Sequence, residues 1–346
     1  MKKSLRIFAS ILSIWTSAQV VLEASEWAFK GDSVMANNVA TYDVCNINLI
    51  YEGEEGYNYS LPKDTLASYL SGKAFDNPEA YTKQESAYLR EDINDLFQKI
   101  ISSNPVREKV AVITAGAPGA GKTIKLRQDL EANSRQFAYI CPDDVCLKNQ
   151  TRTYGADIER GDGSKEAYQA AYNKWRPGSN AATHLILGNL IRENYAFYFG
   201  STSTSPFTYK FFDFLKKQGY KIRLLHVTAP DKVRWESIKE RDKTFVQTTE
   251  QDVKEKGLLL PQRIMDTFLA YADEIDFYYR DGVKKDAQLA AKWVRISDSE
   301  VCGTLQVLSS SLYEQIKSAH DAATEVLQRA DLKWEQTVEK NSKILK

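Results

Sequence analysis

Residues 116–123 read Gly-Ala-Pro-Gly-Ala-Gly-Lys-Thr, and this stretch decides the fold. It matches the pattern G-x-x-x-x-G-K-[ST], in which successive backbone N–H groups converge on phosphate oxygens. Such a loop needs glycine because its backbone adopts positive φ angles and approaches the ligand closely. An apolar run at 110–114 precedes the loop, and a helical pattern begins at Ile124. The sequence therefore predicts a strand, a phosphate loop and a helix that together bind a nucleoside triphosphate.

The residues of the loop have separate expected roles. Gly116, Gly119 and Gly121 supply the conformational freedom, while the positive end of the helix dipole attracts the anion. Lys122 is expected to reach the β and γ phosphates, and Thr123 to ligate Mg²⁺. The expected cofactors are ATP, with GTP as the alternative, and Mg²⁺. The predicted cofactor-binding residues are Gly116, Ala117, Pro118, Gly119, Ala120, Gly121, Lys122 and Thr123. The competing interpretation is a glycine-rich turn followed by a surface lysine.

The composition limits the possible classes of function. With 43% apolar and 27% charged residues among 346, the chain is typical of an ordinary globular protein. Lys plus Arg and Asp plus Glu number 46 each, which argues against a nucleic-acid partner and favours a small-molecule or protein substrate. The four cysteines have no C-x-x-C spacing and the three histidines are scattered, so a zinc site is not expected.

The first 25 residues have the layout of a signal peptide. Lys2, Lys3 and Arg6 precede an apolar run at 7–15, and small residues follow at 16–18. We expect cleavage near Ala18 or Ala24, export of the protein, and no stable membrane span after processing. The alternatives are an uncleaved anchor and an amphipathic helix docked on a cytoplasmic protein.

Two carboxylates follow the second apolar run of the α/β pattern, at 137–141. Asp143 and Asp144 are placed where parallel strands present ligands, beyond their carboxyl ends. A carboxylate there can accept the proton of an acceptor hydroxyl during phosphoryl transfer, so Asp143 is the candidate base, with Asp144 as a neighbour that binds substrate or metal-bound water. The alternative interpretation is a pair of aspartates that caps the next helix.

Further candidates follow the third and fourth strands. The segment 200–206 contains five consecutive hydroxyl residues, of which Ser201 and Thr202 are expected to bind a polar acceptor; a plain polar turn is the alternative. Arg241 ends a helical pattern at 232–242 and enters a polar segment that could form a lid. A cation there can neutralise charge that develops on the transferred phosphoryl group. Arg241 is therefore the third catalytic candidate, with Asp143 and Lys122.

Taken together, these segments resemble the zeta-toxin family of P-loop kinases. The resemblance rests on residues 115–123, 140–144, 199–202, 219–223 and 240–242, and covers about 106–282. It implies the strand order of adenylate kinase and ATP-dependent phosphorylation of a small hydroxyl acceptor, which is UDP-N-acetylglucosamine in the best understood members. By resemblance, Lys122 and Thr123 hold triphosphate and Mg²⁺, Asp143 is the base and Arg241 the stabilising cation. A small-molecule acceptor and an inhibitory protein are the expected partners.

The chain departs from the family pattern at three places. Phe199 stands where the family often has an acidic residue, and Cys146 where an arginine often follows the acidic motif. A second lid arginine is absent from 242–262, which leaves Lys254 or Lys256 as substitutes that cannot make the same bidentate contact. These departures affect the sugar-nucleotide assignment more than the kinase assignment. Another small acceptor, such as a nucleoside or an antibiotic, and a nucleotide-binding module without turnover therefore remain as alternatives.

The expected fold is α/β, a P-loop kinase-like parallel sheet flanked by helices, with helical N- and C-terminal extensions. Strands are predicted at 110–114, 137–141, 195–199, 221–228 and 275–279. A helix is expected from Asn77 to Pro105, with one apolar face at Leu89, Ile93, Leu96 and Ile100. The chain is expected to close with long helices whose apolar face is Leu308, Leu312, Ile316 and Ala319. The predicted divisions are 1–25 (signal), 26–105 (mostly helical extension), 106–300 (kinase domain) and 301–346 (helical extension).

Overall fold

The computed structural model describes residues 43–46, 66, 70, 81–206, 208–243, 247–297 and 301–345. The predicted signal segment and the predicted helix start at Asn77 lie outside these residues. Within the described part, no helix combines the length and the apolar character needed to cross a membrane.

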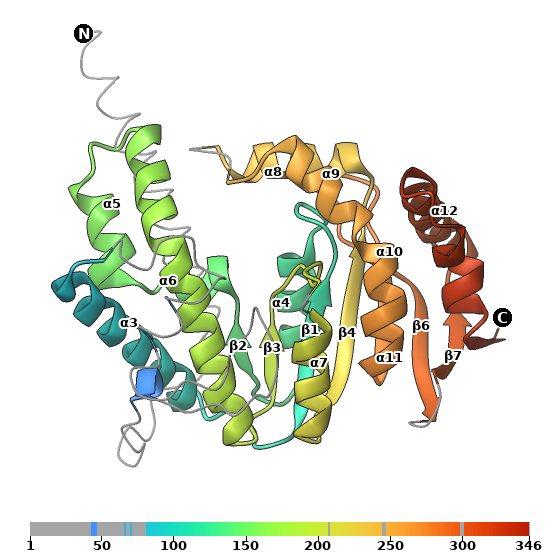
Figure 1. Ribbon diagram of the computed structural model, residues 1–346, viewed down its shortest axis with the longest axis horizontal. Helices are drawn as coiled ribbons and strands as arrows, with labels where there is room; N and C mark the ends of the chain where they lie inside the picture. Colours follow the sequence, from blue (N-terminus) through green and yellow to red (C-terminus); the bar gives the residue numbers. More distant parts are fainter. Residues whose placement is uncertain are drawn as a thin grey trace, which may run out of the picture.

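Eight strands form one sheet through the middle of the molecule (Figure 1). The first five along the chain pair in parallel with one another, in the order β2-β3-β1-β4-β5, and β6 then pairs antiparallel with both β5 and β7. The edge strand β8 pairs parallel with β7. The strands are β1 (Val110–Ala115), β2 (Ala138–Ile140), β3 (Phe197–Phe199), β4 (Lys221–Thr228), β5 (Glu274–Tyr279), β6 (Gln288–Ser297), β7 (Cys302–Val307) and β8 (Ser342–Leu345).

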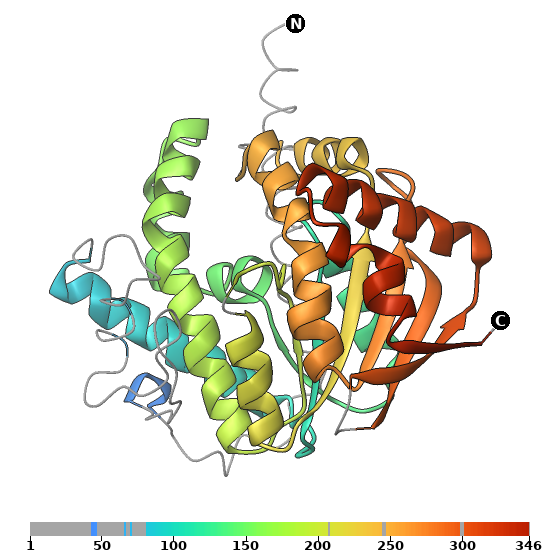
Figure 2. The same ribbon diagram turned by 45° about the vertical axis from the view of Figure 1, so that its right-hand side comes forward.

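Helices flank this sheet, with α7 and the α10–α11 segment in front of it in Figure 1. Helix α12 packs on β5 and β6 and lies beside α10, as Figure 2 also shows. The α-helices are α3 (Lys83–Ser102), α4 (Lys122–Ala132), α5 (Ala156–Arg160), α6 (Lys165–Arg192), α7 (Thr208–Lys217), α8 (Asp231–Arg241), α9 (Glu250–Leu258), α10 (Leu260–Arg263), α11 (Leu269–Tyr271) and α12 (Ser310–Val326). Shorter turns are 3-10 helices η1 (Val44–Asn46) and η6 (Ala330–Leu332), and π-helices η3 (Pro142–Leu147), η4 (Thr151–Gly155), η5 (Ile264–Phe268) and η7 (Glu335–Glu339).

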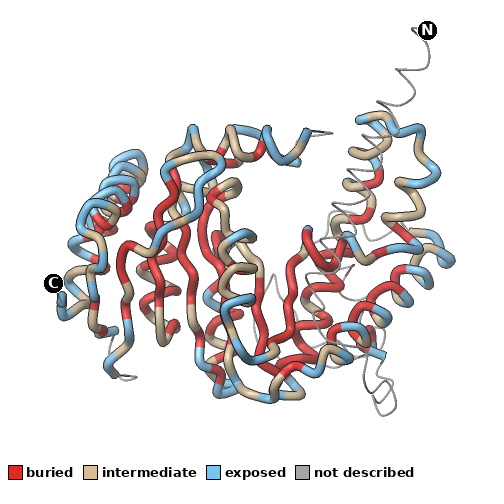
Figure 3. Tube along the Cα trace, turned by 180° about the vertical axis from the view of Figure 1, so that it is seen from behind, coloured by how far each residue is buried: buried red, intermediate tan, exposed pale blue. Residues whose placement is uncertain are grey.

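The five predicted strands of the parallel sheet are all present, because buried parallel strands are short continuous apolar runs that stand out in a sequence. Figure 3 shows buried residues concentrated along these strands. Three further strands, β6, β7 and β8, were not predicted. Within β6, buried Trp293 alternates with half-exposed or exposed neighbours, and the pairing with β7 has a register shift near Arg295. Because of this irregular pattern, the sequence of β6 lacks the regular alternation of apolar and polar residues by which a strand is recognised.

The apolar face of α3 was predicted correctly. Leu89, Ile93, Leu96 and Ile100 are all buried. The helix begins at Lys83, where the side chain of Thr82 accepts from the Glu85 amide and the Glu85 carboxylate accepts from the Thr82 amide. This capping box fixes the first turn because it satisfies two otherwise unpaired N–H groups.

The buried face of α12 agrees with the predicted one only at Ile316. The helix begins only at Ser310, so Leu308 precedes it and is 49% exposed. The residues that α12 buries are Tyr313, Ile316, His320 and Thr324. Of the predicted face, only Ile316 is buried.

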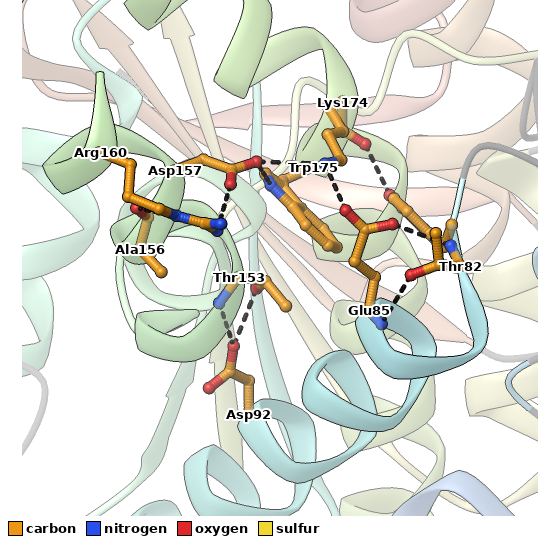
Figure 4. A network of polar contacts seen from close by, with 10 residues as sticks. Thr82, Glu85, Asp92, Thr153, Ala156, Asp157, Arg160, Lys174 and Trp175 are labelled. Carbon is orange, nitrogen blue, oxygen red and sulfur yellow. Dashed lines mark hydrogen bonds and ion pairs between the residues drawn. The ribbon is translucent and has the colours of Figure 1, made fainter. Parts of the chain in front are cut away.

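A polar network joins α3 to the segment between β2 and α6 (Figure 4). Buried Asp92 on α3 accepts hydrogen bonds from the amide and the hydroxyl of Thr153, at 3.1 and 2.8 Å. Glu85 pairs with Lys174 on α6, and Asp157 accepts from the indole N–H of Trp175 at 2.6 Å. Because charge-assisted hydrogen bonds in a buried setting are strong, α3 and α6 are held in one arrangement.

Candidate active site

The phosphate loop connects β1 to α4 and has the predicted glycine geometry. Gly116, Gly119 and Gly121 adopt φ angles of +140°, +77° and +99°. A Cβ atom at Gly119 would collide with the backbone carbonyl of Arg234, and one at Gly116 with that of Val227. The glycines are therefore required both by the backbone angles and by the close approach of β4 and α8.

Lys122 lies at the start of α4, and its ammonium donates to the carbonyl of Ala117 at 2.9 Å. Burial, helped by the positive charges of Arg241, Arg234 and Lys256, lowers the pKa of Lys122 to about 7. A cation is costly in such a place unless an anion joins it. The electrostatics of the loop thus favour a bound anion.

The loop opens into a cavity of about 630 Å³. We call its three walls the loop side, the α6 side and the lid side. Most of the predicted site residues line the cavity: Pro118, Gly119, Lys122 and Thr123 on the loop side, Asp143 on the α6 side, Arg241 on the lid side, and Ser201 and Thr202 between them. Arg176 on the α6 side and Lys256 on the lid side line it as well. The size is that of a small-molecule site.

Asp143 lies in η3 directly after β2, where it faces the cavity with 49% of its side chain exposed. Its carboxylate forms an ion pair with Arg176 of α6, with 2.6 Å between Oδ1 and Nε. The Tyr172 hydroxyl donates to the same oxygen at 3.4 Å and accepts from Arg176 Nε at 3.2 Å. The sequence analysis missed Arg176, because it lies 33 residues beyond Asp143 in a long helix and belongs to no motif.

Asp144 is not brought into the cavity. It is 8% exposed and accepts hydrogen bonds from Arg127 and from the Tyr139 hydroxyl, while Lys148 lies 3.3 Å away. Burial alone would raise the pKa of Asp144, but Arg127 and Lys148 outweigh burial and hold the pKa below its usual value. The expectation that Asp144 binds substrate is corrected accordingly: its carboxylate is engaged in joining η3 to β2 and α4.

The hydroxyl segment after β3 lies against the phosphate loop. The Thr114 hydroxyl donates to the carbonyl of Ser201 at 2.7 Å and accepts from its amide at 2.9 Å. The amide of Gly116 donates to the carbonyl of Thr202 at 3.0 Å. The backbone of Ser201 and Thr202 is thus fixed to β1 and to the loop, and both residues line the cavity.

Aromatic and imidazole groups complete the wall next to α6. Phe199 packs edge-on against Phe211 with ring centroids 5.7 Å apart, in the place where the family pattern often has a carboxylate. Burial lowers the pKa of His184 to about 3, with a smaller effect from Arg176, so the imidazole is neutral near pH 7. This wall is less acidic than the pattern of the family suggests.

Helix α8, next to the lid side, contains two arginines with different environments. Arg241 ends α8, with 60% of its side chain exposed, and pairs with Asp242 at 2.6 Å. Arg234 is only 5% exposed; it donates to the carbonyl of Val253 at 2.7 Å and pairs with Asp231. Arg234 therefore joins α8 to α9, while Arg241 is the arginine of α8 that lines the cavity. Lys256 also lines it and pairs with Asp252 at 2.9 Å, whereas Lys254 does not reach it.

A parallel sheet of order β2-β3-β1-β4-β5 with a phosphate loop after β1 defines a P-loop nucleotide-binding protein of the α/β class. The zeta toxin family model matches residues 80–274, more than half of the chain. The chain belongs to the zeta toxin family, and its membership supports a P-loop phosphotransferase.

Comparison with solved structures finds chains of similar fold, among them the following two. A structure from the PezAT chromosomal toxin-antitoxin system of Streptococcus pneumoniae is 14% identical, with a TM-score of 0.44, and the match covers 72% of this chain and 98% of that one. The complex AvrRxo1-ORF1:-ORF2 with ATP is 13% identical, with a TM-score of 0.49, and the match covers 79% of this chain and 91% of that one. A sequence comparison with curated proteins gives no match.

Proposed function

We propose that this protein transfers the γ-phosphoryl group of ATP to a hydroxyl group of a small acceptor. One observation carries the proposal: Lys122 of the phosphate loop, the carboxylate of Asp143 and the guanidinium of Arg241 line a single cavity. These are the three functions that phosphoryl transfer needs, namely a phosphate cradle, a proton acceptor and a cation for the developing charge.

In the proposed reaction the acceptor oxygen forms a bond to the γ-phosphorus, the bond from that phosphorus to the β,γ-bridging oxygen breaks, and ADP leaves. The acceptor proton passes to Asp143. Lys122 binds the β and γ phosphates, and Arg241 stabilises charge on the transferred group. Arg176 does not touch the reacting atoms; it orients Asp143 through the ion pair and is a positioning residue.

We propose that Mg²⁺ binds on the loop side of the cavity, where Thr123 is part of the lining. Among the described residues no cluster of three or more His, Cys, Asp or Glu side chains could hold a metal. Mg²⁺ in kinases does not require one, because it is held by one or two protein oxygens, substrate phosphates and water. The Thr123 hydroxyl is the protein ligand we propose, and the ion would neutralise phosphate charge.

The acceptor is proposed only by class. UDP-N-acetylglucosamine follows from the family resemblance, but the wall of Phe199, Phe211 and neutral His184 also suits a nucleoside or another ring-bearing alcohol. A nucleotide-binding module without turnover is the second candidate, and the ion pair between Asp143 and Arg176 favours it, since a paired carboxylate is less available as a base.

A product screen distinguishes these candidates. Purified residues 26–346 are incubated with ATP, Mg²⁺ and a panel of sugar nucleotides, nucleosides and aminoglycosides, and products are identified by mass spectrometry. A gain of one phosphoryl group on one panel member supports the kinase and names its acceptor. Tight ATP binding without any phosphorylated product across the panel supports the module without turnover.

An inhibitory protein partner is a further part of the proposal. The PezAT structure is described as part of a toxin-antitoxin system. By analogy, a partner protein that covers the cavity would keep this chain inactive. Copurification of a second protein that lowers ATP binding is the measurement that tests this idea.

A further inference from the structure

A second cavity, of about 370 Å³, lies outside the site described above. Its walls are α12, the α9–α10 segment and the end of β4, and α12 and α10 lie side by side in Figures 1 and 2. We call it the α12 cavity. Of the phosphate loop only Ala117 reaches it, and Lys122, Asp143 and Arg241 do not line it. Both α12 and Trp334 lie beyond residue 274, where the family match ends.

Small and apolar side chains make up most of the lining, which explains why the space is not filled. The lining includes residues with little or no side chain, namely Gly257, Ala319 and Ala323. It also includes two almost fully buried residues, Ile264 and Ile316. The volume falls within the range of natural small-molecule sites, about 300–1,000 Å³. The α12 cavity therefore has the size and the lining to hold a small ligand that is mostly apolar.

The buried part of the lining contains an unsatisfied polar atom. His226 is 3% exposed, and its Nε2 has no hydrogen-bond partner within the described residues. Its Nδ1 lies 3.4 Å from the Thr228 hydroxyl. By contrast, the neighbouring His320 uses Nε2 in a contact of 2.7 Å with the carbonyl of Leu332. A buried polar atom without a partner destabilises the protein, and a ligand that supplies the hydrogen bond would remove this cost.

The charges around the α12 cavity are already paired. Arg234 pairs with Asp231, and Lys254 pairs with Glu250 at 3.2 Å. Burial lowers the pKa of His226 to about 3, with smaller contributions from His320 and Lys122, so this imidazole is neutral at pH 7. A charged ligand would lose hydration without finding an unpaired opposite charge. The lining is suited to an uncharged molecule.

We propose that the α12 cavity is a binding site for a small uncharged molecule with an apolar body and one hydroxyl group that hydrogen-bonds to Nε2 of His226. A hydroxyl suits either tautomer of this neutral histidine, because it can both donate and accept. The ligand would contact Ala117, and so reach the phosphate loop from the side away from the nucleotide.

Fluorine NMR with 4-fluorobenzyl alcohol tests the proposal on the full chain. This probe has an aromatic ring, one hydroxyl and no charge, and 4-fluorotoluene is the matched probe without the hydroxyl. We expect saturable binding of the alcohol, seen as a concentration-dependent shift and broadening of its signal. No saturable binding at millimolar concentrations overturns the proposal.

Variants on α12 locate the probe. Ala323→Phe fills the cavity and should weaken binding at least about tenfold, while Ser318→Phe, which adds the same ring at an exposed position outside the lining, should leave it within about twofold. If Ala323→Phe does not fold, Ala319→Leu replaces it. Equal binding to the wild type and to a folded filled variant places the probe elsewhere and overturns the proposal.

A variant of His226 tests the hydrogen bond itself. His226→Phe removes the polar atom and keeps a ring, so affinity for the alcohol should fall about fivefold while affinity for 4-fluorotoluene stays the same or rises. The melting temperature should not fall below that of Ser318→Phe by more than a few degrees, because an unsatisfied atom has been removed. Equal loss of both probes, or no loss of either, contradicts the assigned role of His226.

Discussion

The loop side and the α6 side face each other across one cavity, but different constraints determine them. Backbone geometry determines the arrangement of the loop side, where Gly116 and Gly119 are held at positive φ against β4 and α8. Side chains from separate elements determine the arrangement of the α6 side, since Asp143 follows β2 and Arg176 comes from the middle of α6. The loop side therefore tolerates almost no substitution. The α6 side depends on side chains, so substitutions there can change which phosphoryl acceptor is bound. We therefore expect mutations on the two sides to separate nucleotide binding from turnover.

The largest effect is expected on the loop side, from Lys122→Ala. This change removes the ammonium that should bind the β and γ phosphates, so ATP affinity should fall about ten- to a hundredfold and turnover should be lost. Calorimetric titration with ATP measures it. The matched control is Lys125→Ala, because Lys125 lies three residues further along α4 with its ammonium 4.6 Å from the ring centroid of Tyr278, outside the cavity. Equal ATP affinity in wild type and a folded Lys122→Ala variant would remove the loop from nucleotide binding.

On the α6 side, Asp143→Asn should separate binding from rate. The amide cannot accept the acceptor proton, so turnover should fall about 10²- to 10⁴-fold while the dissociation constant of ATP changes little. Steady-state kinetics and calorimetry on the same sample provide both numbers. Loss of ATP binding in this variant would make Asp143 a ligand of the metal or a structural residue instead.

The role of Arg176 in orienting Asp143 predicts a smaller effect of the same kind. In Arg176→Gln the carboxylate loses its ion pair, and we expect kcat to fall about ten- to a hundredfold because the base is misplaced, with no change in ATP affinity. Arg176→Lys should restore part of the rate, since it keeps the charge. A rise in kcat in Arg176→Gln would show instead that the ion pair restrains the base, as expected for the module without turnover.

The pH dependence of ATP binding reports on Lys122 directly. Its pKa is about 7 in the free protein, and a bound phosphate should raise it by favouring the charged form. Above pH 7 the free protein has lost this proton and must take it up on binding, so ATP affinity should fall with rising pH, by up to about tenfold per pH unit. Calorimetry in two buffers of different ionisation enthalpy at pH 8 counts the protons. Absence of uptake in wild type, or equal uptake in Lys122→Ala, would assign the proton to another group.

Asp144→Ala should affect stability and not the chemistry. It leaves Arg127 and the Tyr139 hydroxyl without their acceptor, at an expected cost of about 1–3 kcal/mol in the free energy of unfolding. Denaturant unfolding measures this loss. Turnover per folded molecule should stay within a few-fold of wild type. A loss as large as that in Asp143→Asn would return Asp144 to the reaction.

The features of the site that could be predicted from the sequence are those that depend on residues close together in the chain. The phosphate loop is recognisable because glycine, lysine and threonine occur at fixed spacing in one short stretch, and Asp143 because it directly follows a buried strand. Arg176 was not predictable, since its ion pair depends on how α6 crosses η3. Asp144 shows the opposite problem: it shares the motif with Asp143, but neighbouring residues on a helical turn point in different directions.

The C-terminal region was predicted less well for a related reason. The predicted face of α12 began at Leu308, but the helix begins only at Ser310, after β7, a strand that was not predicted. The α12 cavity was also not predictable, because its lining comes from five separate segments of the chain. Predictions of this kind need the three-dimensional arrangement.

The central claim is that the two sides of the cavity act on one phosphoryl group, and transfer of label from γ-³²P-ATP tests it most directly. With the acceptor found in the product screen, the account predicts that wild type places label on the acceptor in equal amount to the ADP formed, and that Asp143→Asn binds ATP equally well but transfers label at least about a hundredfold more slowly. Label that appears only as free phosphate, or transfer at equal rates in the two proteins, would contradict it.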